Sequence, residues 1–513
     1  MADLTFDAVI VGGGNKGLLL AMYLMKYGGM SVGIFERRHE IGGCLATEET
    51  SAPGFRGNTH ANIILPMYYL PVWRDFPDFW EYGGRWDQHL CSDGFVFRNN
   101  DTALGIYSTK YDPTQERSAQ QIARFSKKDA DKWLKLSALE RSREYWRVQA
   151  DLIFNPAEFR ADPGVMTRQV EFFPKMVEAG FTPDGLVLTS SSIRQIREWF
   201  ESPELQSCIL RFAVSGVNDI NESGFGAISM GLASYLPLIG FAPGGTHQIA
   251  HACHQILVQM GCKFYTHAEV DKVIIENGAA KGVRMMDGSQ VKANKIVVSA
   301  GMAPHQLCFD LIGREYIDPM LAKRVELIEK SFGCLMWYTF AVHQAPKYKA
   351  EAFFPDIHEC EWLGMQPDSN PEHIARECMY MKMGMWPPFE DYAPTVGCHS
   401  LADPAYAPPG KHVLQNEQLA PPATRHTEKE WLEIKERYAD ELVQIWQQYA
   451  PNMTWDNVIG VDTNSPYDHL RMKNLAPMGT MAGIDRSYYQ VEGNRPTPEL
   501  ANHRTPIKNL YAT

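Results

Sequence analysis

Two features common in other protein classes are missing from this sequence. No run of eighteen apolar residues occurs in its 513 positions, so we expect no transmembrane helix. Acidic residues number 61 and basic residues 49, and the Lys and Arg side chains are not gathered into the patches that bind phosphate backbones. These absences exclude a helical integral membrane protein and argue against nucleic acid as the partner.

Paired cysteine motifs are also missing. The ten cysteines include no C-x-x-C and follow no regular spacing, which indicates free thiols of a reducing compartment, and we expect a cytoplasmic protein. The first residues lack the basic stretch and cleavage site of a signal peptide. A content of 45% hydrophobic and 21% charged residues is typical of a folded globular protein.

What is present begins with a nucleotide fingerprint. An apolar strand over residues 6–11 runs into Gly12, Gly14 and Gly17, which form G-x-G-x-x-G, and residues 18–27 have the pattern of a buried helix. This strand, turn and helix would hold a pyrophosphate at the helix N-terminus. Glu36 ends a second short strand, over residues 31–35, where a carboxylate accepts hydrogen bonds from ribose hydroxyls.

Further motifs make the prediction more specific. The series continues with E-R-R-x-x-x-G-G at 36–43, T-E-E at 47–49, P-G-G at 243–245, R-P-x-P-E-L at 495–500 and T-P-I-x-x-L-Y at 505–511. It resembles the FAD-binding signature of the phytoene-desaturase-like flavoproteins, within the wider amine-oxidase and Rab-GDI-like fold group. The resemblance implies an α/β fold in which a Rossmann-type FAD-binding domain is built from discontinuous segments, with an inserted α+β substrate or cap domain. We expect the FAD-binding domain at 1–60, 240–305 and 480–513, and the cap domain at 61–239 and 306–479.

The same resemblance implies which residues contact FAD. Arg37 is expected beside the adenosine and the backbone of Val270 at the adenine, while Cys44 either faces the flavin or is a small buried apolar residue. After Thr513 the family pattern continues with a glycine-rich turn, which we expect to lie beyond this sequence. The full predicted set is Gly12, Gly14, Gly17, Glu36, Arg37, Gly43, Cys44, Gly244, Gly245, Val270 and Ala300.

Two segments outside the motif blocks are predicted to be helical. Residues 126–149 follow a cap pattern, Ser126-x-x-Asp129, and Thr427-x-x-Glu430 precedes an apolar series that starts at Trp431. The apolar and aromatic stretch at 63–73 either lines a substrate entrance or packs as an interdomain loop, and the sequence leaves both open.

Candidate catalytic groups are few. His60 follows the pair Gly54-Phe55, which belongs to the same family signature. It could move a proton beside the flavin, although a structural histidine is the simpler account of it. Arg471 resembles a family residue near the substrate cavity, or it pairs with Asp468 at i, i+3. Relatives often carry an acid where Asn58 stands. A histidine stripe at residues 247, 251 and 254 lacks a carboxylate on its helix face, so we expect no metal site.

The function predicted from these patterns is oxidation of an apolar or aromatic small molecule by hydride transfer to FAD. Only one dinucleotide fingerprint is present, so a second module for NAD(P)H is not expected, and oxygen or a quinone would accept the electrons. Two alternatives stay open. One is a flavin-dependent isomerase or hydratase without net redox change, and the other is a Rab-GDI-like lipid-binding protein without flavin. Peripheral membrane contact is also left open.

Overall fold

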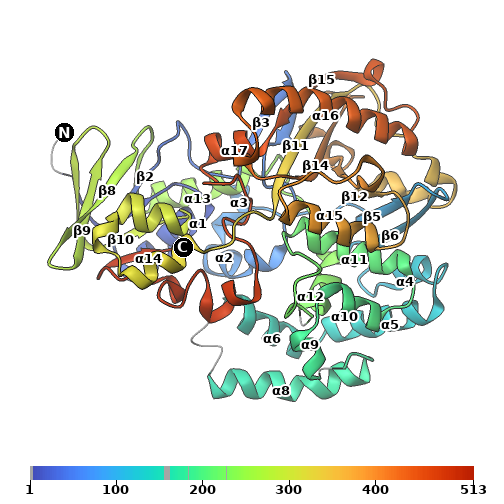
Figure 1. The fold of residues 1–513 in the computed structure, drawn as a ribbon, viewed down its shortest axis with the longest axis horizontal. Coiled ribbons are helices and arrows are strands. Elements are labelled where there is room, and N and C mark those ends of the chain that lie inside the picture. The colour runs from blue at the N-terminus through green and yellow to red at the C-terminus, as the bar shows by residue number, and fades with distance from the viewer. Residues whose placement is uncertain (1–3, 155–161, 183, 227) are drawn as a thin grey trace.

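The computed structural model of the protein describes residues 4–154, 162–182, 184–226 and 228–513 (Figure 1). Two seven-stranded sheets dominate the described residues, and a two-stranded sheet, β3 (Thr47–Ala52) with β4 (Phe55–Asn58), accompanies them. In Figure 1 the first large sheet lies on the left and the second on the right, with a layer of helices below the second. The mixed architecture confirms the predicted α/β fold class.

The first sheet combines segments from the start, middle and end of the chain. Its order is β7-β2-β1-β10-β9-β8, and β16 pairs with β10. Parallel pairing joins β7, β2, β1, β10 and β16, while β9 and β8 extend the sheet antiparallel. The strands are β1 (Leu4–Val11), β2 (Val32–Phe35), β7 (Lys263–Tyr265), β8 (Val270–Glu276), β9 (Ala279–Met285), β10 (Gln290–Ser299) and β16 (Leu510–Ala512).

Burial on both faces explains why β1 is almost continuously apolar. Ala8 and Ile10 pack on one side against α1 (Asn15–Gly28) and α13 (His247–Gln259), and Val9 and Val11 pack on the other. All four side chains are buried. A parallel strand covered on both faces needs this composition, and its carboxyl end is where such sheets bind ligands.

The second sheet has the order β15-β11-β14-β13-β12-β5-β6, in which only β5 and β12 pair in parallel. The long helix α16 (Glu428–Tyr449) covers it through Trp431, Leu442 and Trp446, and the predicted capping box of Thr427 and Glu430 is present at its start. The strands are β5 (Cys91–Phe97), β6 (Thr102–Tyr107), β11 (Cys334–Val342), β12 (Cys360–Gln366), β13 (Thr395–Gly397), β14 (His412–Ala420) and β15 (Val458–Asn464).

The helix predicted at 126–149 is two helices, so its length was wrong. Ser126 caps α5 (Lys127–Glu140) by accepting from the N–H of Asp129, as predicted. The hydroxyl of Ser142 then accepts from the N–H of Tyr145 at 3.2 Å, which starts α6 (Arg143–Phe154). The other helices are α2 (Leu70–Asp75), α3 (Asp78–Glu81), α4 (Glu116–Ile122), α8 (Pro163–Glu178), α9 (Gly185–Thr189), α10 (Ser192–Trp199), α11 (Pro203–Ser215), α12 (Ile228–Tyr235), α14 (Pro319–Glu326), α15 (Glu372–Lys382) and α17 (Pro466–Lys473).

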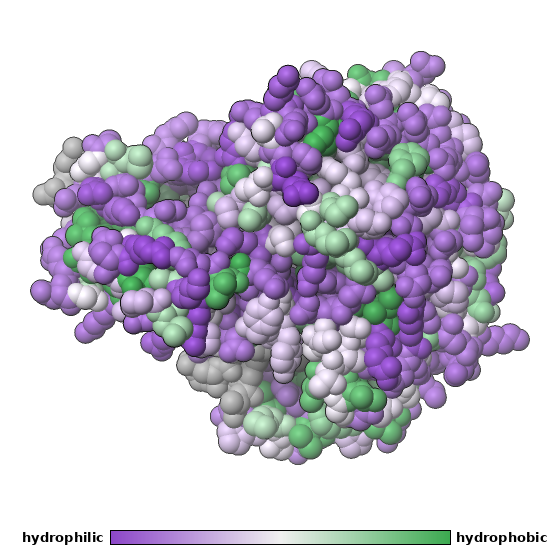
Figure 2. Space-filling view, viewed as in Figure 1, coloured by the Kyte–Doolittle hydropathy of each residue, from purple (hydrophilic) through white to green (hydrophobic). Residues whose placement is uncertain are grey.

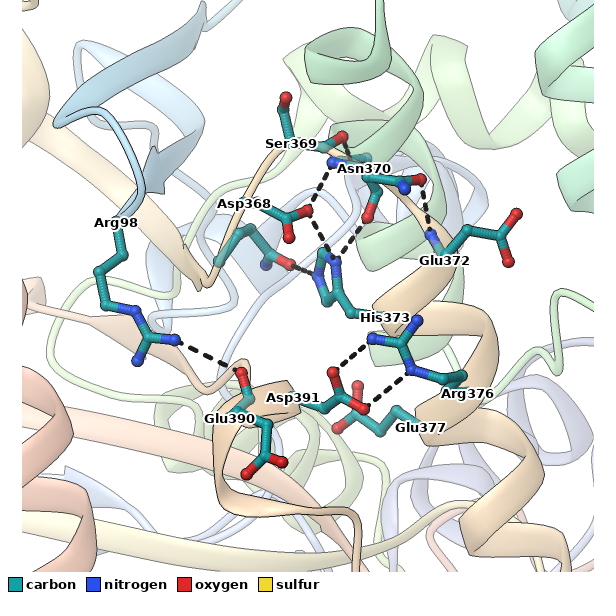
Figure 3. A network of polar contacts seen from close by, with 12 residues as sticks. Arg98, Asp368, Ser369, Asn370, Glu372, His373, Arg376, Glu377, Glu390 and Asp391 are labelled. Atoms are coloured by element: carbon teal, nitrogen blue, oxygen red, sulfur yellow. Dashed lines mark hydrogen bonds and ion pairs between the residues drawn. The ribbon is translucent and has the colours of Figure 1, made fainter.

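A polar network fixes α15 to the end of β12 (Figure 3). The ring nitrogens of His373 lie 2.6 Å from the backbone oxygen of Asn370 and 2.6 Å from the amide oxygen of Gln366. Arg376 donates to Asp391 across the same region, with 2.9 Å between Nε and Oδ2. Because both nitrogens of this buried histidine are satisfied, the network is structural.

Two predictions that were based on missing sequence features can be compared with the described residues. No helix among them is long and apolar enough to cross a membrane. All ten cysteines are free thiols. The division into two discontinuous domains stays a prediction.

Candidate functional site

Two glycines of the turn after β1 leave no room for a side chain. A Cβ on Gly17 would lie 2.4 Å from the backbone oxygen of Gly12, and one on Gly12, whose φ is +103°, would lie 2.8 Å from the oxygen of Ala300. Gly14 is the N-cap of α1 and supplies no side-chain cap. The first N–H groups of α1 therefore stay available for an anion, and the bare backbone allows it to approach.

Glu36 is fixed beside this turn. One carboxylate oxygen accepts from the N–H of Gly13 at 2.8 Å, and the other accepts from the N–H of Arg38 at 2.9 Å. The N–H of Ala268 donates to the backbone oxygen of Glu36, which brings the start of β8 at Val270 next to the carboxylate. The predicted ribose-binding acid and the predicted adenine-binding segment thus lie together.

The second glycine pair closes over the first. The N–H of Gly42 donates to the backbone oxygen of Gly13 at 2.8 Å, and a Cβ on Gly43 would lie 3.0 Å from the Cα of Gly14. Both φ angles are positive, +113° and +60°. Cys44 follows, and burial raises the pKa of its thiol, so it stays protonated at neutral pH.

A buried cation lies near Cys44. The Lys473 side chain is 1% exposed, its ammonium has no hydrogen-bond partner in the described residues, and the nearest carboxylate oxygen, on Glu48, is 4.0 Å away. Burial lowers the pKa of Lys473, and the charge of Arg38 lowers it further. A buried cation without a hydrogen bond is costly, and an anionic group bound here would satisfy it. This orphaned ammonium and the glycine turn fit a dinucleotide diphosphate.

Sequence reasoning missed Lys473 and Arg38. Arg38 had a usable signal, because it is the second arginine of the E-R-R motif. Lys473 had none, since it lies at the end of α17, far from the glycine motifs in the chain.

The predicted residue His60 lies against a second histidine, His469, with 4.5 Å between ring centroids. Burial is the main cause that holds the pKa of His60 well below its usual value and lowers that of His469 to about 4. Nε2 of His60 is buried and has no hydrogen-bond partner in the described part of the chain. Both rings are therefore neutral near pH 7, and His60 has a nitrogen free to exchange a proton.

Arg471 has an exposed side chain, 60% accessible, and its guanidinium lies 3.7 Å from the Asp468 carboxylate. This contact supports the ion-pair interpretation over a catalytic one. Its backbone oxygen also accepts from the guanidinium of the predicted FAD contact Arg37 at 3.2 Å. The fold therefore brings Arg37 and α17 together, which the sequence did not indicate.

The glycines at 244 and 245 approach protein groups. A Cβ on Gly245, whose φ is +105°, would lie 2.3 Å from the hydroxyl of Thr47. The N–H of Gly244 donates to the carboxylate of Asp403 at 2.7 Å. Close packing thus explains why residue 245 is glycine, and a flavin contact at these positions stays a prediction.

Asn58 is a buried hub between the two large sheets. Its amide oxygen accepts from the Thr47 hydroxyl at 2.8 Å and from the N–H of Thr246 at 3.0 Å. Its amide nitrogen lies 3.3 Å from both Asn62 Oδ1 and the Tyr406 hydroxyl. An amide donates and accepts at once, so Asn58 can satisfy all of these partners.

The aromatic stretch at 63–73 packs largely inside the molecule. Ile64, Tyr69 and Val72 are buried in the core that includes α1 and α13, whereas Tyr68 and Leu70 are about half exposed. This arrangement supports interior packing for most of the stretch, but the stretch is not a loop throughout, because its end belongs to α2.

Comparisons with known proteins agree with this geometry. The model of the NAD(P)-binding Rossmann-like domain matches residues 10–79. A rat protein named pyridine nucleotide-disulfide oxidoreductase domain-containing protein 2 is 26% identical over 99% of this chain and 89% of its own. One of the limonene dehydrogenase chains of Castellaniella defragrans is 24% identical over 98% and 90%. The neurosporene-forming phytoene desaturase of Cereibacter sphaeroides is 22% identical over 52% and 48%. The chain is an oxidoreductase of the FAD-dependent desaturase-like type.

A solved structure shows the same fold over the whole chain. Wild-type putrescine oxidase bound to putrescine superposes with a TM-score of 0.58 at 13% identity, covering 100% of this chain and 94% of that one. The predicted resemblance, enzyme class and FAD cofactor are thus confirmed, while the individual contact residues stay predictions. FAD is the cofactor of this type of oxidoreductase, and the glycine turn, Glu36 and the orphaned Lys473 ammonium fit it.

Proposed function

We propose that this oxidoreductase is a dehydrogenase or desaturase that removes two hydrogens from neighbouring carbons of an apolar or aromatic small molecule. One hydrogen leaves as a hydride and the other as a proton, so the product gains a double bond. The observation that carries the proposal is the anion-ready glycine turn with Glu36 at its edge and the orphaned Lys473 ammonium nearby. The names of the limonene dehydrogenase and phytoene desaturase relatives support the apolar substrate class.

Each element of the site has a proposed task. FAD, when bound, supplies the two-electron acceptor. Glu36 would accept hydrogen bonds from the ribose hydroxyls, and the N-terminus of α1 with Lys473 would hold the diphosphate. Backbone around Gly43, Gly244 and Gly245 would border the flavin, and Val270 would meet the adenine.

His60 is the proposed proton acceptor. Its Nε2 has no partner in the described residues, and its lowered pKa keeps it neutral and able to take a proton at pH 7. The positive charges of Lys473 and Arg38 disfavour a charge on His60, so the proton is released again readily. Arg471, paired with Asp468 and largely exposed, would hold α17 against Arg37 and not act on substrate.

An apolar stripe on α8 supports peripheral contact with a lipid surface, from which an apolar substrate would come. Met166, Val170, Phe173 and Val177 are all exposed, at helical spacing i, i+4, i+7 and i+11. Apolar residues are visible along the lower edge of the molecule in Figure 2, where Figure 1 places α8. Oxygen or a quinone is the proposed electron acceptor.

The test starts from the absorption spectrum of the purified protein and the identity of flavin released on denaturation. If FAD is released, the protein is next mixed anaerobically with unsaturated and saturated terpenoid hydrocarbons. Bleaching of the flavin absorption band then identifies a hydride donor. Product formed with one equivalent of oxygen or quinone consumed supports the dehydrogenase. Product formed without any acceptor would replace it with the isomerase or hydratase, and colourless protein that does not take up FAD would overturn both.

A further inference from the structure

A cluster of three side chains lies away from the nucleotide turn, inside the second sheet. His89 precedes β5, Glu361 is on β12, and His399 follows β13. All three side chains are 0% exposed. One nitrogen of each imidazole and one carboxylate oxygen lie within 4.8 Å of one another. Among the residues that the structure describes, this is the single group with such an arrangement of potential metal ligands.

The contacts in this cluster are short but are not hydrogen bonds. His89 Nε2 lies 2.9 Å from one oxygen of Glu361, and His399 Nδ1 lies 2.9 Å from the other. Yet these four atoms are buried without a hydrogen-bond partner in the described residues, because the ring nitrogens do not point along the lines to the oxygens. Ligands of one ion have this geometry, since each lone pair points at the ion and not at the neighbouring ligand.

The tautomer of His399 also supports a bound cation. Its Nε2 contacts the Oδ1 atom of Asn62, which also accepts from the amide nitrogen of Asn58 at 3.3 Å. An acceptor there places the proton of neutral His399 on Nε2. Nδ1 of the neutral ring then presents a lone pair toward the Glu361 carboxylate, which is repulsive unless a cation lies between them or the ring carries a second proton. A metal-bound histidine whose other nitrogen donates to a fixed oxygen is the usual arrangement in metal sites.

The surroundings strengthen the need for a cation. Phe241 packs on both rings, at 5.2 Å from His89 and 6.0 Å from His399 between centroids, and Tyr406 lies 5.2 Å from His399. A carboxylate inside this aromatic shell has a high desolvation cost, which cationic partners must offset. A divalent ion binds the carboxylate and both lone pairs at once.

We propose that His89, Glu361 and His399 bind one divalent transition-metal ion. An ion about 2.1 Å from each ligand atom subtends an angle near 90° between atoms 2.9 Å apart, within the range that two-histidine, one-carboxylate sites adopt. The ion joins β5, β12 and the turn after β13, and through Asn62 it fixes Asn58, the hub between the two sheets. Its role is structural. The proposal departs from the expectation of no metal site, which rested on the helix stripe at 247–254.

Sequence patterns did not reveal this site because its ligands lie 272 and 38 residues apart, in positions 89, 361 and 399, without a local spacing motif. His247 of the rejected stripe has another contact, since its Nδ1 lies 2.7 Å from the backbone oxygen of Leu45. That stripe provides a natural control.

The first experiment measures metal in protein produced without a histidine tag, in medium supplemented with zinc, iron, manganese, cobalt and nickel. Plasma mass spectrometry is expected to find about one equivalent of one metal per chain in the wild type and in His251→Asn, and less than a tenth in Glu361→Gln and His399→Asn. Retention of metal by both cluster variants, or its loss in His251→Asn, would overturn the proposal.

A second measurement needs no variant and so does not depend on their folding. X-ray absorption at the edge of the bound metal is expected to show two imidazoles and carboxylate oxygen as ligands. A shell containing sulfur would overturn the assignment, and so would wild-type protein that folds with less than a tenth of an equivalent of any supplied metal.

Discussion

The amide oxygen of Asn58 accepts a hydrogen bond from the backbone N–H of Thr246 at 3.0 Å, although the two residues are 188 positions apart. Thr246 immediately precedes α13, and Asn58 ends β4. This bond, together with those to Thr47 and Asn62, joins the start of the chain to the helix that covers the first sheet.

Replacement of Asn58 tests this hub. Asn58→Asp keeps the acceptors but loses the amide donor to Asn62 and Tyr406 and adds a buried charge, so we expect the free energy of unfolding to fall by about 2–4 kcal/mol. Asn99→Asp, exposed just after β5, is the matched control and should change little. Urea unfolding measures both. Equal midpoints for Asn58→Asp and wild type would show that the network is not a stabilising one.

Loss of the Glu36 carboxylate should weaken FAD binding. Glu36→Ala removes both oxygens that face the glycine turn and Arg38, and we expect a 10- to 100-fold rise in the Kd for FAD, about 1.4–2.8 kcal/mol. Flavin fluorescence quenching during titration of the apoprotein gives the Kd. Glu276→Ala, exposed at the end of β8, serves as control. Unchanged affinity in Glu36→Ala would place the ribose elsewhere.

Lys473 is expected to act through charge. Lys473→Met keeps the buried stem and removes the ammonium, so FAD affinity should fall at least tenfold, about 1.4 kcal/mol. The apoprotein should at the same time become more stable, because the uncompensated buried charge is gone. Lys429→Met, 87% exposed on α16, should alter neither quantity. Stronger FAD binding in Lys473→Met would contradict a diphosphate at this position.

Gly17 is the turn residue least able to accept a side chain. Its Cβ would lie 2.4 Å from the Gly12 oxygen, a backbone atom held by the sheet, so Gly17→Ala should cost about 1–3 kcal/mol and reduce FAD loading. Gly185→Ala places a Cβ in open space at the start of α9 and should be neutral or slightly stabilising. Thermal unfolding with and without FAD compares the pair, and equal losses in both would contradict the steric argument.

Acid should destabilise the apoprotein through His469. Its pKa is about 4 in the folded protein and about 6.5 when unfolded, so the unfolded chain binds more protons between these values. The stability it contributes is therefore complete above pH 6.5 and is lost as pH falls toward 4, by about 3 kcal/mol over the whole range. His60, whose pKa is also lowered, acts in the same direction.

Urea unfolding of apoprotein from pH 7.5 to 4.5 measures this loss. His469→Gln should flatten the slope, whereas His39→Gln, with a 63% exposed side chain, should not. Bound FAD should also flatten it, because a diphosphate near the histidines raises their pKa. A slope that is the same in wild type and His469→Gln would assign the acid sensitivity to other groups.

Local sequence patterns were enough to predict β1, β2 and the glycine turn between β1 and α1. Gly17 falls where the backbone oxygen of Gly12 excludes a side chain, and continuous apolar character identifies a strand buried on both faces. Capping patterns at Ser126 and Thr427 were equally local and proved correct. These features depend on neighbours within a few residues, so they can be read along the chain.

Which distant groups meet depends instead on how the sheets and helices pack. Lys473 and His469 on α17 reach His60 and Cys44, and His89, Glu361 and His399 converge from three separate segments of the second sheet. No short-range sequence pattern predicts these contacts, because strand order and helix packing create them. The pairing of β5 with β12, for example, brings His89 close to Glu361. Burial then sets the chemistry, since the charge and proton affinity of these groups depend on the desolvation that packing imposes.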